Sequence, residues 1–597
     1  MSALAEAKAL AAAGKPEEAA RRLREALASR MNYLDQLNAA KLADTLSADL
    51  PPVRLAVLGS STTAQLLPLL RLHGFKEGLR VELYDAPFDA YQQEILDDKS
   101  GLYAFKPQAA LLFVNYRDAR PGPAEAEAER WRSLWTFLRE RAGCAVLMNN
   151  FDCPVERPWG NLEVARTDAG LGRLRRLNAL LAEKAGAGAA LIDVEHVSAV
   201  LGKENWHDPR FWHHSRQAMS FEGLARYAAE AASVLAAALG RSRKCLVLDL
   251  DNTLWGGVVG DDGVEALELA GSPSGEAFLD FQRYVKELGR RGVLLAVCSK
   301  NDDARAREPF LKRADMVLRL EDFSAFIANW EDKATNLRAI AGMLHLGLDA
   351  LVFSDDSPIE LELVRRFCPE VAVVELPEDP AGYCRALDTR RLFETVVISH
   401  EDASRAAHFQ AETARAQLQQ KAPDLCSFLR DLEMTSDAGP FAEADVARLS
   451  QLINKTNQFN LTTRRYSEPE VRAVMKDPSA WTLALRLRDR LGDYGLISAV
   501  IAYRKGKILE IDTWLMSCRV LGRGVEKLAF NRLLEAARAA GAESISARYL
   551  PTPKNGPVQE LLPSLGFVAA ADGVWRLPTA GAKPQEVSIR DGSSTAA

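Results

Sequence analysis

The chain has 597 residues, of which 48% are hydrophobic and 26% charged, and its formal net charge is −6. This length is too great for one hydrophobic core and predicts three or four domains of a soluble globular protein. The negative balance gives no reason to expect nucleic acid as a partner, and no apolar run is long enough to cross a membrane. The first fifteen residues do not resemble a signal peptide, and the eight cysteines form no C-x-x-C pair, so we expect reduced thiols and a cytoplasmic protein.

Residues 1–50 are rich in Ala, Leu and Arg and predict two or three helices that cap the next domain. Residues 51–240 change to continuous apolar runs separated by helical stretches. The predicted strands lie at 53–58, 109–114, 145–149 and 189–193. Such strands are typical of a parallel sheet that is covered on both faces, as in a flavodoxin-like domain.

The first strand of this domain ends in Gly59-Ser60-Ser61, which resembles the nucleophile turn of an SGNH-type hydrolase. Asp193 and His196 have the spacing of its catalytic partners, and Asn115 could donate to an oxyanion. We expect a degenerate domain that serves packing or partner binding, and an active hydrolase is the alternative. A later cluster could bind a metal, although its aromatic neighbours favour ordinary packing: His207, His213 and His214.

Residues 241–395 form a second predicted α/β unit, with strands at 245–250, 293–298, 316–318, 350–353 and 371–375. Polar groups follow in order, most of them at strand ends, where open parallel sheets bind ligands. They are Asp249, Asp251, Thr253, Cys298, Ser299, Asn301, Lys333, Asp355 and Asp356. Carboxylates suit Mg²⁺, and a lysine offsets the charge of a phosphoryl group, so this pattern predicts phosphoryl transfer.

Residues 396–440 predict a helical connector, and residues 441–578 a third unit with strands near 481–487, 496–503 and 508–514 and a helix over 525–540. This third unit carries 20 Lys and Arg against 14 Asp and Glu, roughly +6, although the whole chain is negative. An acidic partner for this unit is therefore plausible. Residues 579–597 are small and polar and predict a disordered tail.

The segment Asp249-Leu-Asp-Asn-Thr-Leu resembles the first motif of the haloacid-dehalogenase (HAD) phosphotransferases. Longer segments are similar to the FkbH-like family. They are 249–263, 298–301, 355–360, 455–465, 517–524 and 549–555. The resemblance implies an α/β multidomain protein, with an SGNH-like parallel sheet, a HAD Rossmann-like domain and a GNAT-like mixed α+β domain.

The resemblance also implies roles for single residues. Asp249 would be the nucleophile and Asp251 the general acid and then base. Ser299 and Lys333 would contact the phosphoryl group, with Thr253 and Asn301 nearby in the substrate site. The implied Mg²⁺ ligands are Asp249, Asp251 through its carbonyl, Asp355 and Asp356.

In this family a glyceryl group passes from 1,3-bisphosphoglycerate to an enzyme thiol. The HAD site removes the 3-phosphate. The glyceryl then moves to the phosphopantetheine thiol of an acyl carrier protein, for a polyketide extender unit. Cys298 is the expected enzyme thiol, because Lys300 and a helix N-terminus nearby would favour its thiolate; the alternative is a buried packing cysteine. Cys518 is a second candidate, and Cys245 is expected to pack.

Arg519, Gly522 and Gly524 match the pyrophosphate loop of GNAT acyltransferases, where backbone N–H groups and a helix N-terminus hold phosphate. This loop could serve acetyl-CoA or dock the phosphopantetheine arm of a carrier protein. The candidate contacts with an acidic carrier are Arg464, Arg465, Arg519 and Arg523. Two other functions remain open from the sequence: a stand-alone HAD phosphatase acting on a small metabolite, and a scaffold that only docks a carrier protein.

Overall fold

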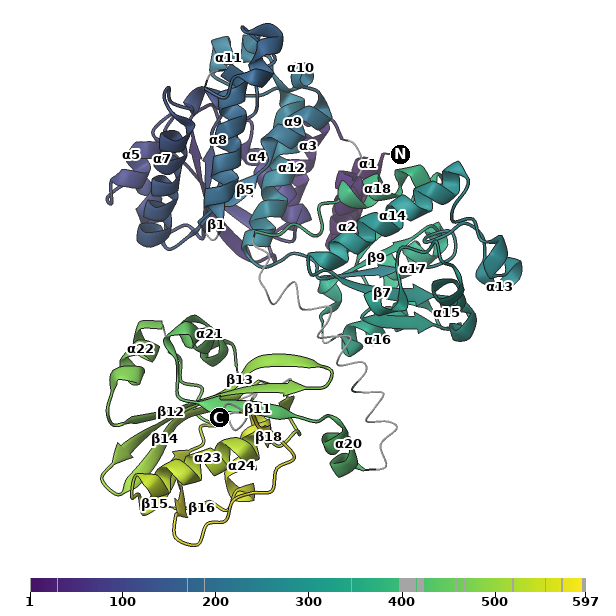
Figure 1. The fold of residues 1–597 in the computed structure, drawn as a ribbon. Coiled ribbons are helices and arrows are strands. Elements are labelled where there is room, and N and C mark those ends of the chain that lie inside the picture. The colour runs from purple at the N-terminus through teal and green to yellow at the C-terminus, as the bar shows by residue number, and fades with distance from the viewer. Residues whose placement is uncertain are drawn as a thin grey trace. The chain divides into compact units, whose positions relative to one another are not determined.

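The computed structural model describes residues 2–28, 31–168, 170–186, 188–344, 346–396, 415, 424–456, 459–466, 468–517, 520–552, 555–570 and 573–592. The chain divides into two compact units, Met1–Ala406 and Ala407–Ala597 (Figure 1). Most of the predicted connector at 396–440 therefore lies outside the described residues. Within the described part, no helix is both long and apolar enough to span a membrane.

Three helices open the first unit: α1 (Ala3–Ala12), α2 (Pro16–Ala28) and α3 (Tyr33–Leu46). Ser2 and Asn32 cap α1 and α3 by accepting backbone N–H groups of the first turn. Small residues on α3 pack with Leu72 and Phe75 of α4 (Leu67–Lys76). This packing fixes the helical segment to the first α/β domain.

The first sheet is entirely parallel, with strand order β2-β1-β3-β4-β5. Its strands are β1 (Pro52–Gly59), β2 (Arg80–Asp85), β3 (Ala109–Phe113), β4 (Ala145–Asn149) and β5 (Ala190–Ile192). Alternate residues of β1 point to opposite faces, so Val57 joins the core under α4 and α12 (Phe221–Ala238). Leu58 joins the core under α7 (Ala124–Phe137) and α8 (Gly170–Ala185) (Figure 1). The predicted parallel sheet is confirmed. The edge strand β2 was missed, because only one of its six residues is buried and it lacks an apolar run.

The second sheet is also parallel, with order β10-β9-β6-β7-β8. Its strands are β6 (Cys245–Leu248), β7 (Leu294–Ser299), β8 (Ala325–Ala328), β9 (Leu351–Asp355) and β10 (Ala372–Glu375). The central position of β6 places its carboxyl end between the ends of β7 and β9.

The strand predicted at 316–318 is wrong, and β8 takes its place at the sheet edge. Met316 and Leu318 are buried, as their apolar character predicts. The backbone N–H groups of Val317 and Leu318, however, donate to Gln282 Oε1 at 2.9 and 3.1 Å rather than to a strand. Gln282 lies on α14 (Pro273–Arg290), so a long-range side chain satisfies this segment.

The second unit contains one mixed sheet, with order β16-β17-β15-β14-β13-β12-β11-β18. Its strands are β11 (Thr435–Gly439), β12 (Ala480–Asp489), β13 (Gly492–Lys505), β14 (Ile508–Met516), β15 (Ser544–Arg548), β16 (Val568–Ala569), β17 (Val574–Pro578) and β18 (Arg590–Asp591). β14 and β15 are parallel neighbours joined through α23 (Val525–Ala539), whereas β12, β13 and β14 pair antiparallel. The predicted mixed α+β character is therefore observed.

Two segments at the borders of this unit differ from the prediction. α20 (Leu425–Asp431) and β11 lie before residue 441, so the sheet begins inside the segment predicted as a connector. β18 lies inside the predicted disordered tail and pairs in parallel with β11. Ile589 is buried and Arg590 N donates to Met434 O at 2.9 Å, so a hydrophobic anchor and backbone hydrogen bonds order this polar segment. Residues 593–597 lie outside the described part.

Removal of residues 584–597 should destabilise the C-terminal unit, because it deletes β18, the Ile589 side chain and the hydrogen bonds between Gln585 and Asn531. Scanning calorimetry of the full chain should show a lower melting temperature for one transition. Hydrogen exchange should show faster exchange in β11. Removal of 593–597 alone is the matched control and should change neither. Equal behaviour of the two truncations would contradict a structural role for β18.

Candidate active site

Three carboxylates gather at the carboxyl edge of the second sheet. Asp249 follows β6 directly, and its N–H donates to Ser354 O of β9 at 3.1 Å, which fixes the two strand ends together. Asp355 ends β9, and Asp356 follows it. One oxygen atom from each of Asp249, Asp355 and Asp356 lies within 4.8 Å of the others. The described residues thus form a compact set of oxygen ligands at this edge.

Lys333 is the cation of this cluster. It is the first residue of α16 (Lys333–Met343), and its side chain is only 2% exposed. Its Nζ donates to Asp249 Oδ1 and to Cys298 O, both at 2.7 Å, and lies 3.4 Å from Asp355 Oδ2. Burial by itself would lower the pKa of Lys333, but Asp249 and Asp355 outweigh burial and hold this pKa above its usual value. The lysine is therefore charged in the folded protein.

The carboxylates carry more negative charge than Lys333 balances. Burial and the charge of Asp249 raise the pKa of Asp355, and the same two causes raise the pKa of Asp356. Within the described structure Asp355 Oδ2 is buried without a hydrogen-bond partner, while Oδ1 accepts from Ser357 N at 2.8 Å. Neighbouring carboxylates that repel one another, one of them with a buried oxygen that lacks a donor, fit a hard divalent cation.

Asp251 is held apart from the three clustered carboxylates. Its Oδ1 accepts from Trp255 Nε1 at 2.9 Å and from Val259 N at 3.0 Å, and its Oδ2 accepts from Asn301 Nδ2 at 2.7 Å. Burial nevertheless raises the pKa of Asp251 above its ordinary value. A carboxyl group that is fixed in orientation and has a raised pKa is suited to donate a proton. Its side chain is not part of the carboxylate group that could hold a metal.

The turn after Asp251 depends on residues that the sequence did not single out. Asn252 has φ +51°, in the left-handed region, and its Oδ1 accepts from Gly257 N at 3.0 Å. Tyr383 Oη donates to Asn252 O at 2.7 Å from more than a hundred residues away. Trp255 lies inside the segment that carries the family resemblance, whereas Tyr383 gave no sequence signal.

The other residues predicted for the phosphoryl-transfer site are Ser299, Thr253 and Asn301, and their surroundings differ. Ser299 is the last residue of β7, beside Cys298, and is buried. Thr253 is fully buried, and within the described structure its Oγ1 has no hydrogen-bond partner. Asn301 orients Asp251, as described above, rather than standing free for substrate. Asp249, Lys333, Asp355 and Asp356 therefore lie together, and Asn301 contacts Asp251.

The structure does not favour a reactive thiolate at Cys298, and the predicted role of this residue as the enzyme thiol stays a prediction. The residue is 0% exposed, and its Sγ lies 3.9 Å from Lys333 O, on the face of the sheet that α16 covers. Burial raises its pKa to about 12, although Lys333 opposes this shift. Lys300, which was expected to favour the thiolate, pairs with Glu360 Oε1 at 2.7 Å instead. Cys298 is a packing residue next to the site.

Among the described residues, no other cysteine lies beside the carboxylates as an exposed thiol. Cys245, at the start of β6, is buried as predicted. Among the cysteines whose surroundings the structure describes, Cys384 alone is partly exposed, and it lines a cavity of about 1730 Å³ in the first unit. Burial raises its pKa as well. Cys518 lies outside the described residues.

The predicted phosphate-binding turn precedes α23 in the second unit. Gly522 and Gly524 have φ of +74° and +81°, a conformation that glycine adopts without strain. Arg519 lies outside the described residues. Arg523, predicted to contact a carrier protein, is 8% exposed; it donates to Tyr494 Oη and lies 3.6 Å from Asp489 Oδ2. A buried arginine held in this way braces the turn and is not a surface contact.

The two other predicted arginines also have partners within the chain. Arg464 pairs with Asp512 while 58% of its side chain stays exposed, so it can still meet a partner. Arg465 donates through Nη1 to the carbonyl oxygens of Ile453 and Asn454 at 2.6 and 2.7 Å.

Three sequence segments of the second unit meet at one place. The pairing of β14 with β15 ends at Ile511 and Ala547. Beyond this point Leu461 bridges the two strands: its N–H donates to Trp514 O at 3.1 Å, and its carbonyl accepts from Leu550 N at 2.9 Å. Asn555 Nδ2 donates to Asn460 O at 3.0 Å and to Leu550 O at 2.9 Å. The segments around 460, 514 and 550 are therefore parts of one framework.

The residues of the alternative, an active serine hydrolase, do not assemble in the first domain. Ser60 Oγ donates to Asp118 Oδ2 at 2.5 Å and accepts from Asn115 Nδ2 at 3.3 Å. Asn115 thus reaches the serine as expected, but the carboxylate partner of Ser60 is Asp118. Asp193 Oδ1 instead accepts from His196 N at 3.1 Å and caps α9 (Val194–Leu201). The Asp-x-x-His spacing reflects a helix cap.

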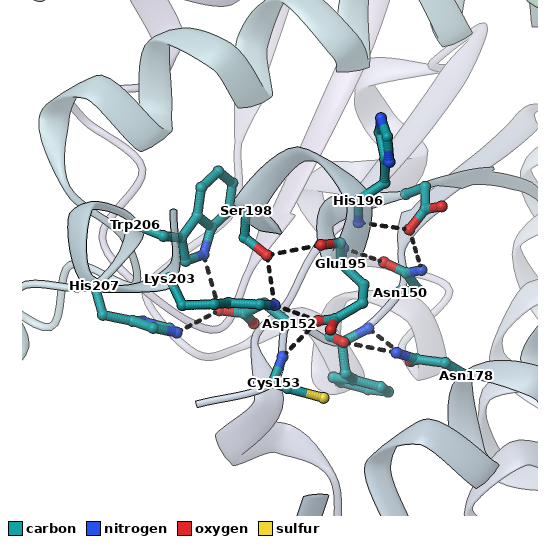
Figure 2. Close-up of polar contacts among 12 residues, drawn as sticks. Asn150, Asp152, Cys153, Asn178, Glu195, His196, Ser198, Lys203, Trp206 and His207 are labelled. Carbon is teal, nitrogen blue, oxygen red and sulfur yellow. Dashed lines mark hydrogen bonds and ion pairs between the residues drawn. The ribbon is translucent and has the colours of Figure 1, made fainter. Parts of the chain in front are cut away.

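Figure 2 shows the polar network around this cap, with the ring of His196 turned away from the neighbouring carboxylates. Glu195 accepts from Cys153 N at 2.7 Å and pairs with Lys203. Asp152 accepts from Trp206 Nε1 at 2.9 Å and lies 3.0 Å from His207 Nε2. His213 and His214 are exposed, and among the described residues the three predicted histidines form no metal-ligand group.

Comparison with known proteins identifies the first two domains. The family model described as FkbH, N-terminal domain, matches residues 54–236. The N-terminal part of the protein BF1531 from Bacteroides fragilis, which contains a phosphatase domain and was crystallised with Mg, is 33% identical, with a TM-score of 0.56. The match covers 62% of this chain and 100% of that one. A search of the curated proteins gave no significant match.

Acetyltransferase structures match a smaller part of the chain. The ribosomal-protein-S18-alanine N-acetyltransferase of Escherichia coli is 13% identical over 26% of this chain and 99% of its own, with a TM-score of 0.20. Spermidine N-acetyltransferase from Vibrio cholerae is 14% identical over 25% of this chain and 96% of its own, also with a TM-score of 0.20. Scores this low establish nothing about the second unit. The phosphatase-domain relative, the matching family model and the carboxylate cluster agree, and the chain belongs to the FkbH-like family, with a HAD-type phosphatase domain.

Proposed function

We propose that this protein loads a glyceryl group from 1,3-bisphosphoglycerate onto an acyl carrier protein and removes the remaining phosphate at the HAD site. The product would be an activated unit for a polyketide-type extender. The observation that carries the proposal is the convergence of Asp249, Asp355 and Asp356 on buried Lys333. Membership in the FkbH-like family supports the glyceryl and carrier-protein parts of the proposal.

The site supports Mg²⁺ as the divalent ion. The relative from Bacteroides fragilis was complexed with Mg. The same kind of oxygen ligand is available here, and Asp249, Asp355 and Asp356 would hold the ion. A bound Mg²⁺ would neutralise the charge of the transferring phosphoryl group.

Phosphate removal then follows from the arrangement of the carboxylates. A carboxylate oxygen of Asp249 attacks phosphorus, and the bond between phosphorus and the glyceryl oxygen breaks. Asp251 donates its proton to this leaving oxygen, and Lys333 offsets the negative charge. Asp251 then takes a proton from water, and the water oxygen attacks the phosphorus held on Asp249. The bond between phosphorus and the Asp249 oxygen breaks, which restores the carboxylate and releases inorganic phosphate.

The acyl step requires a thiol, which the described phosphoryl site does not expose. We infer that the phosphopantetheine thiol of the carrier attacks the acyl phosphate directly. Its sulfur bonds to the carbonyl carbon, the bond from that carbon to the phosphate oxygen breaks, and the thiol proton passes to solvent. A carrier of acidic surface suits the basic C-terminal unit, where the turn at Gly522 and Gly524 would lie near the arm.

One observation favours a second candidate, a stand-alone phosphatase acting on a small phosphorylated metabolite. Cys298 is sealed beneath α16, and such a phosphatase needs no thiol beside the carboxylates.

Asp249→Asn should lower phosphate release from phosphorylated substrates by roughly 10³-fold or more, because the nucleophile is lost. The change can be followed as inorganic phosphate released by the full chain in the presence of Mg²⁺. Asp280→Asn is the matched control: Asp280 is an exposed carboxylate on α14 that pairs with Arg283. Its activity should equal that of the wild type. Wild-type phosphatase activity in Asp249→Asn would contradict the proposed role of Asp249 as nucleophile.

Without Mg²⁺, the protein should lose stability as the pH rises. The pKa of Asp355 is raised from 3.8 to about 7, so between these values the folded state binds more protons than the unfolded chain. This stability is fully present below pH 3.8 and disappears as the pH passes about 7. Mg²⁺ replaces the proton, so the gain in melting temperature on adding Mg²⁺ should grow from acidic to neutral pH. In Asp355→Asn the rise in melting temperature on adding Mg²⁺ should no longer depend on pH. If this rise did not depend on pH in the wild type, the raised pKa of Asp355 would not be the cause.

The decisive experiment for the acyl step is mass spectrometry of a holo acyl carrier protein incubated with enzyme, Mg²⁺ and 1,3-bisphosphoglycerate. The carrier should gain a glyceryl group, and with Asp249→Asn it should accumulate a phosphoglyceryl group instead. Cys298→Ala should still load the carrier, because its sulfur is buried. Phosphate release with no adduct on any protein would establish the second candidate instead. If Cys298→Ala lost carrier loading but kept phosphatase activity, the result would show that the Cys298 thiol takes part in glyceryl transfer.

A further inference from the structure

Three large apolar side chains are exposed next to the carboxylate site. Val258, Trp330 and Ile359 are 37%, 76% and 74% exposed. They lie on the three segments that follow β6, β8 and β9 at the carboxyl edge of the second sheet. We call these three residues the apolar rim. Single exposed apolar residues are common on protein surfaces, but several that gather beside a site of polar chemistry indicate a binding surface.

Trp330 is held beside the phosphoryl site by the backbone on both sides of it. The residue before it, Asn329, donates through its N–H to Ser299 O at 3.2 Å. Three residues after it, Lys333 Nζ donates to Asp249 Oδ1 at 2.7 Å. Adjacent Cα atoms are about 3.8 Å apart, so the Cα of Trp330 lies at most about 11 Å from that of Lys333. Its exposed ring therefore stands close to the residues that would hold the phosphate.

Ile359, the second residue of α17 (Pro358–Phe367), is fixed in the same way. Two residues before it, Ser357 N donates to Asp355 Oδ1 at 2.8 Å. The residue after it, Glu360, accepts from Lys300 Nζ at 2.7 Å. Lys300 directly follows the serine that anchors the segment of Trp330. The two most exposed rim residues are thus each one position away from contacts with two consecutive residues.

Val258 belongs to the turn that orients Asp251. Its N–H donates to Asp262 Oδ2 at 2.8 Å, and the N–H of the next residue, Val259, donates to Asp251 Oδ1 at 3.0 Å. Each member of the apolar rim is therefore close in sequence to a residue that contacts a carboxylate of the site.

Two cations beside these segments already have partners. Lys300 pairs with Glu360, and Arg305, on α15 (Asp303–Lys312), donates to Gly260 O at 3.0 Å. A small phosphorylated acid carries a second negative charge at its far end, and such a charge binds best to a cation that is free to meet it. An uncharged chain with apolar parts fits this edge of the site better.

We propose that the apolar rim binds the phosphopantetheine arm of the carrier protein, while the phosphate of the loaded glyceryl group lies between Asp249 and Lys333. This inference rests on the proposed function, because the arm belongs to that substrate. The short glyceryl group alone separates the phosphate from the thioester sulfur, so the arm begins close to the phosphoryl site. The part of the arm next to the sulfur is uncharged, and its amides and methyl groups suit contact with Trp330 and Ile359.

The test compares three substrates with the full chain and Mg²⁺: 3-phosphoglycerate, its thioester with free pantetheine, and the same thioester on the carrier protein. Phosphate release gives KM and kcat for each. Trp330→Ala should raise KM roughly tenfold for both thioesters and leave KM for 3-phosphoglycerate unchanged, because only the thioesters carry the arm. Ile359→Ala should give a smaller rise, and Trp330→Phe should restore most of the loss. Leu311→Ala is the matched control, since Leu311 is 72% exposed on α15, outside the rim.

The outcomes separate this inference from the proposed function. It is overturned if Trp330→Ala keeps the wild-type KM for both thioesters while the wild type acts on them; the proposed function then stands. It is also overturned if KM rises equally for 3-phosphoglycerate, as a structural defect would cause, or only for the carrier-bound thioester, which would assign Trp330 to the surface of the carrier. A wild type that releases phosphate from 3-phosphoglycerate but from neither thioester would overturn the proposed function and this inference together.

Discussion

The repulsion among three carboxylates at the end of β6 and β9 is the constraint on which the phosphatase domain depends. Asp249, Asp355 and Asp356 are brought within a few ångströms of one another by adjacent parallel strands. Buried Lys333 contacts Asp249 and Asp355 and so relieves part of this repulsion. Its single positive charge does not balance three carboxylates. A proton on Asp355 or a bound cation would relieve the rest of the repulsion, and this couples the stability of the fold to the occupancy of the site.

Asp251 illustrates how the fold separates two carboxylates of one motif into two roles. A left-handed residue, Asn252, reverses the chain immediately after Asp251, and Tyr383 holds that turn from a distant helix. The side chain of Asp251 therefore faces Trp255 and Asn301, while Asp249 faces Lys333. This separation suits the proposed roles, attack on phosphorus for Asp249 and proton transfer for Asp251.

Charge is distributed unevenly along the chain in a way that matters for the proposed function. The phosphatase domain concentrates carboxylates at its sheet edge, where a ligand of positive charge would balance them. Residues 441–578 are basic instead, although the chain as a whole is negative, and this suits an acidic partner.

The sequence by itself determined the parallel sheets, the carboxylate motifs and their order, because strand ends in a parallel sheet must meet at one edge and the residue types there define hard-ion and phosphate chemistry. It failed where a distant contact decides the outcome. The segment at 316–318 is apolar enough for a strand, yet Gln282 binds its backbone, and β18 is polar yet anchored by Ile589. The position of Cys298 at the end of a strand is compatible with an exposed or a buried sulfur. The sulfur is buried because α16 packs over it and places the carbonyl of Lys333 beside it. Burial and the pairing of charges depend on neighbours that are distant in sequence, so the burial of this thiol and the partners of Asp251 were decided by the tertiary structure alone.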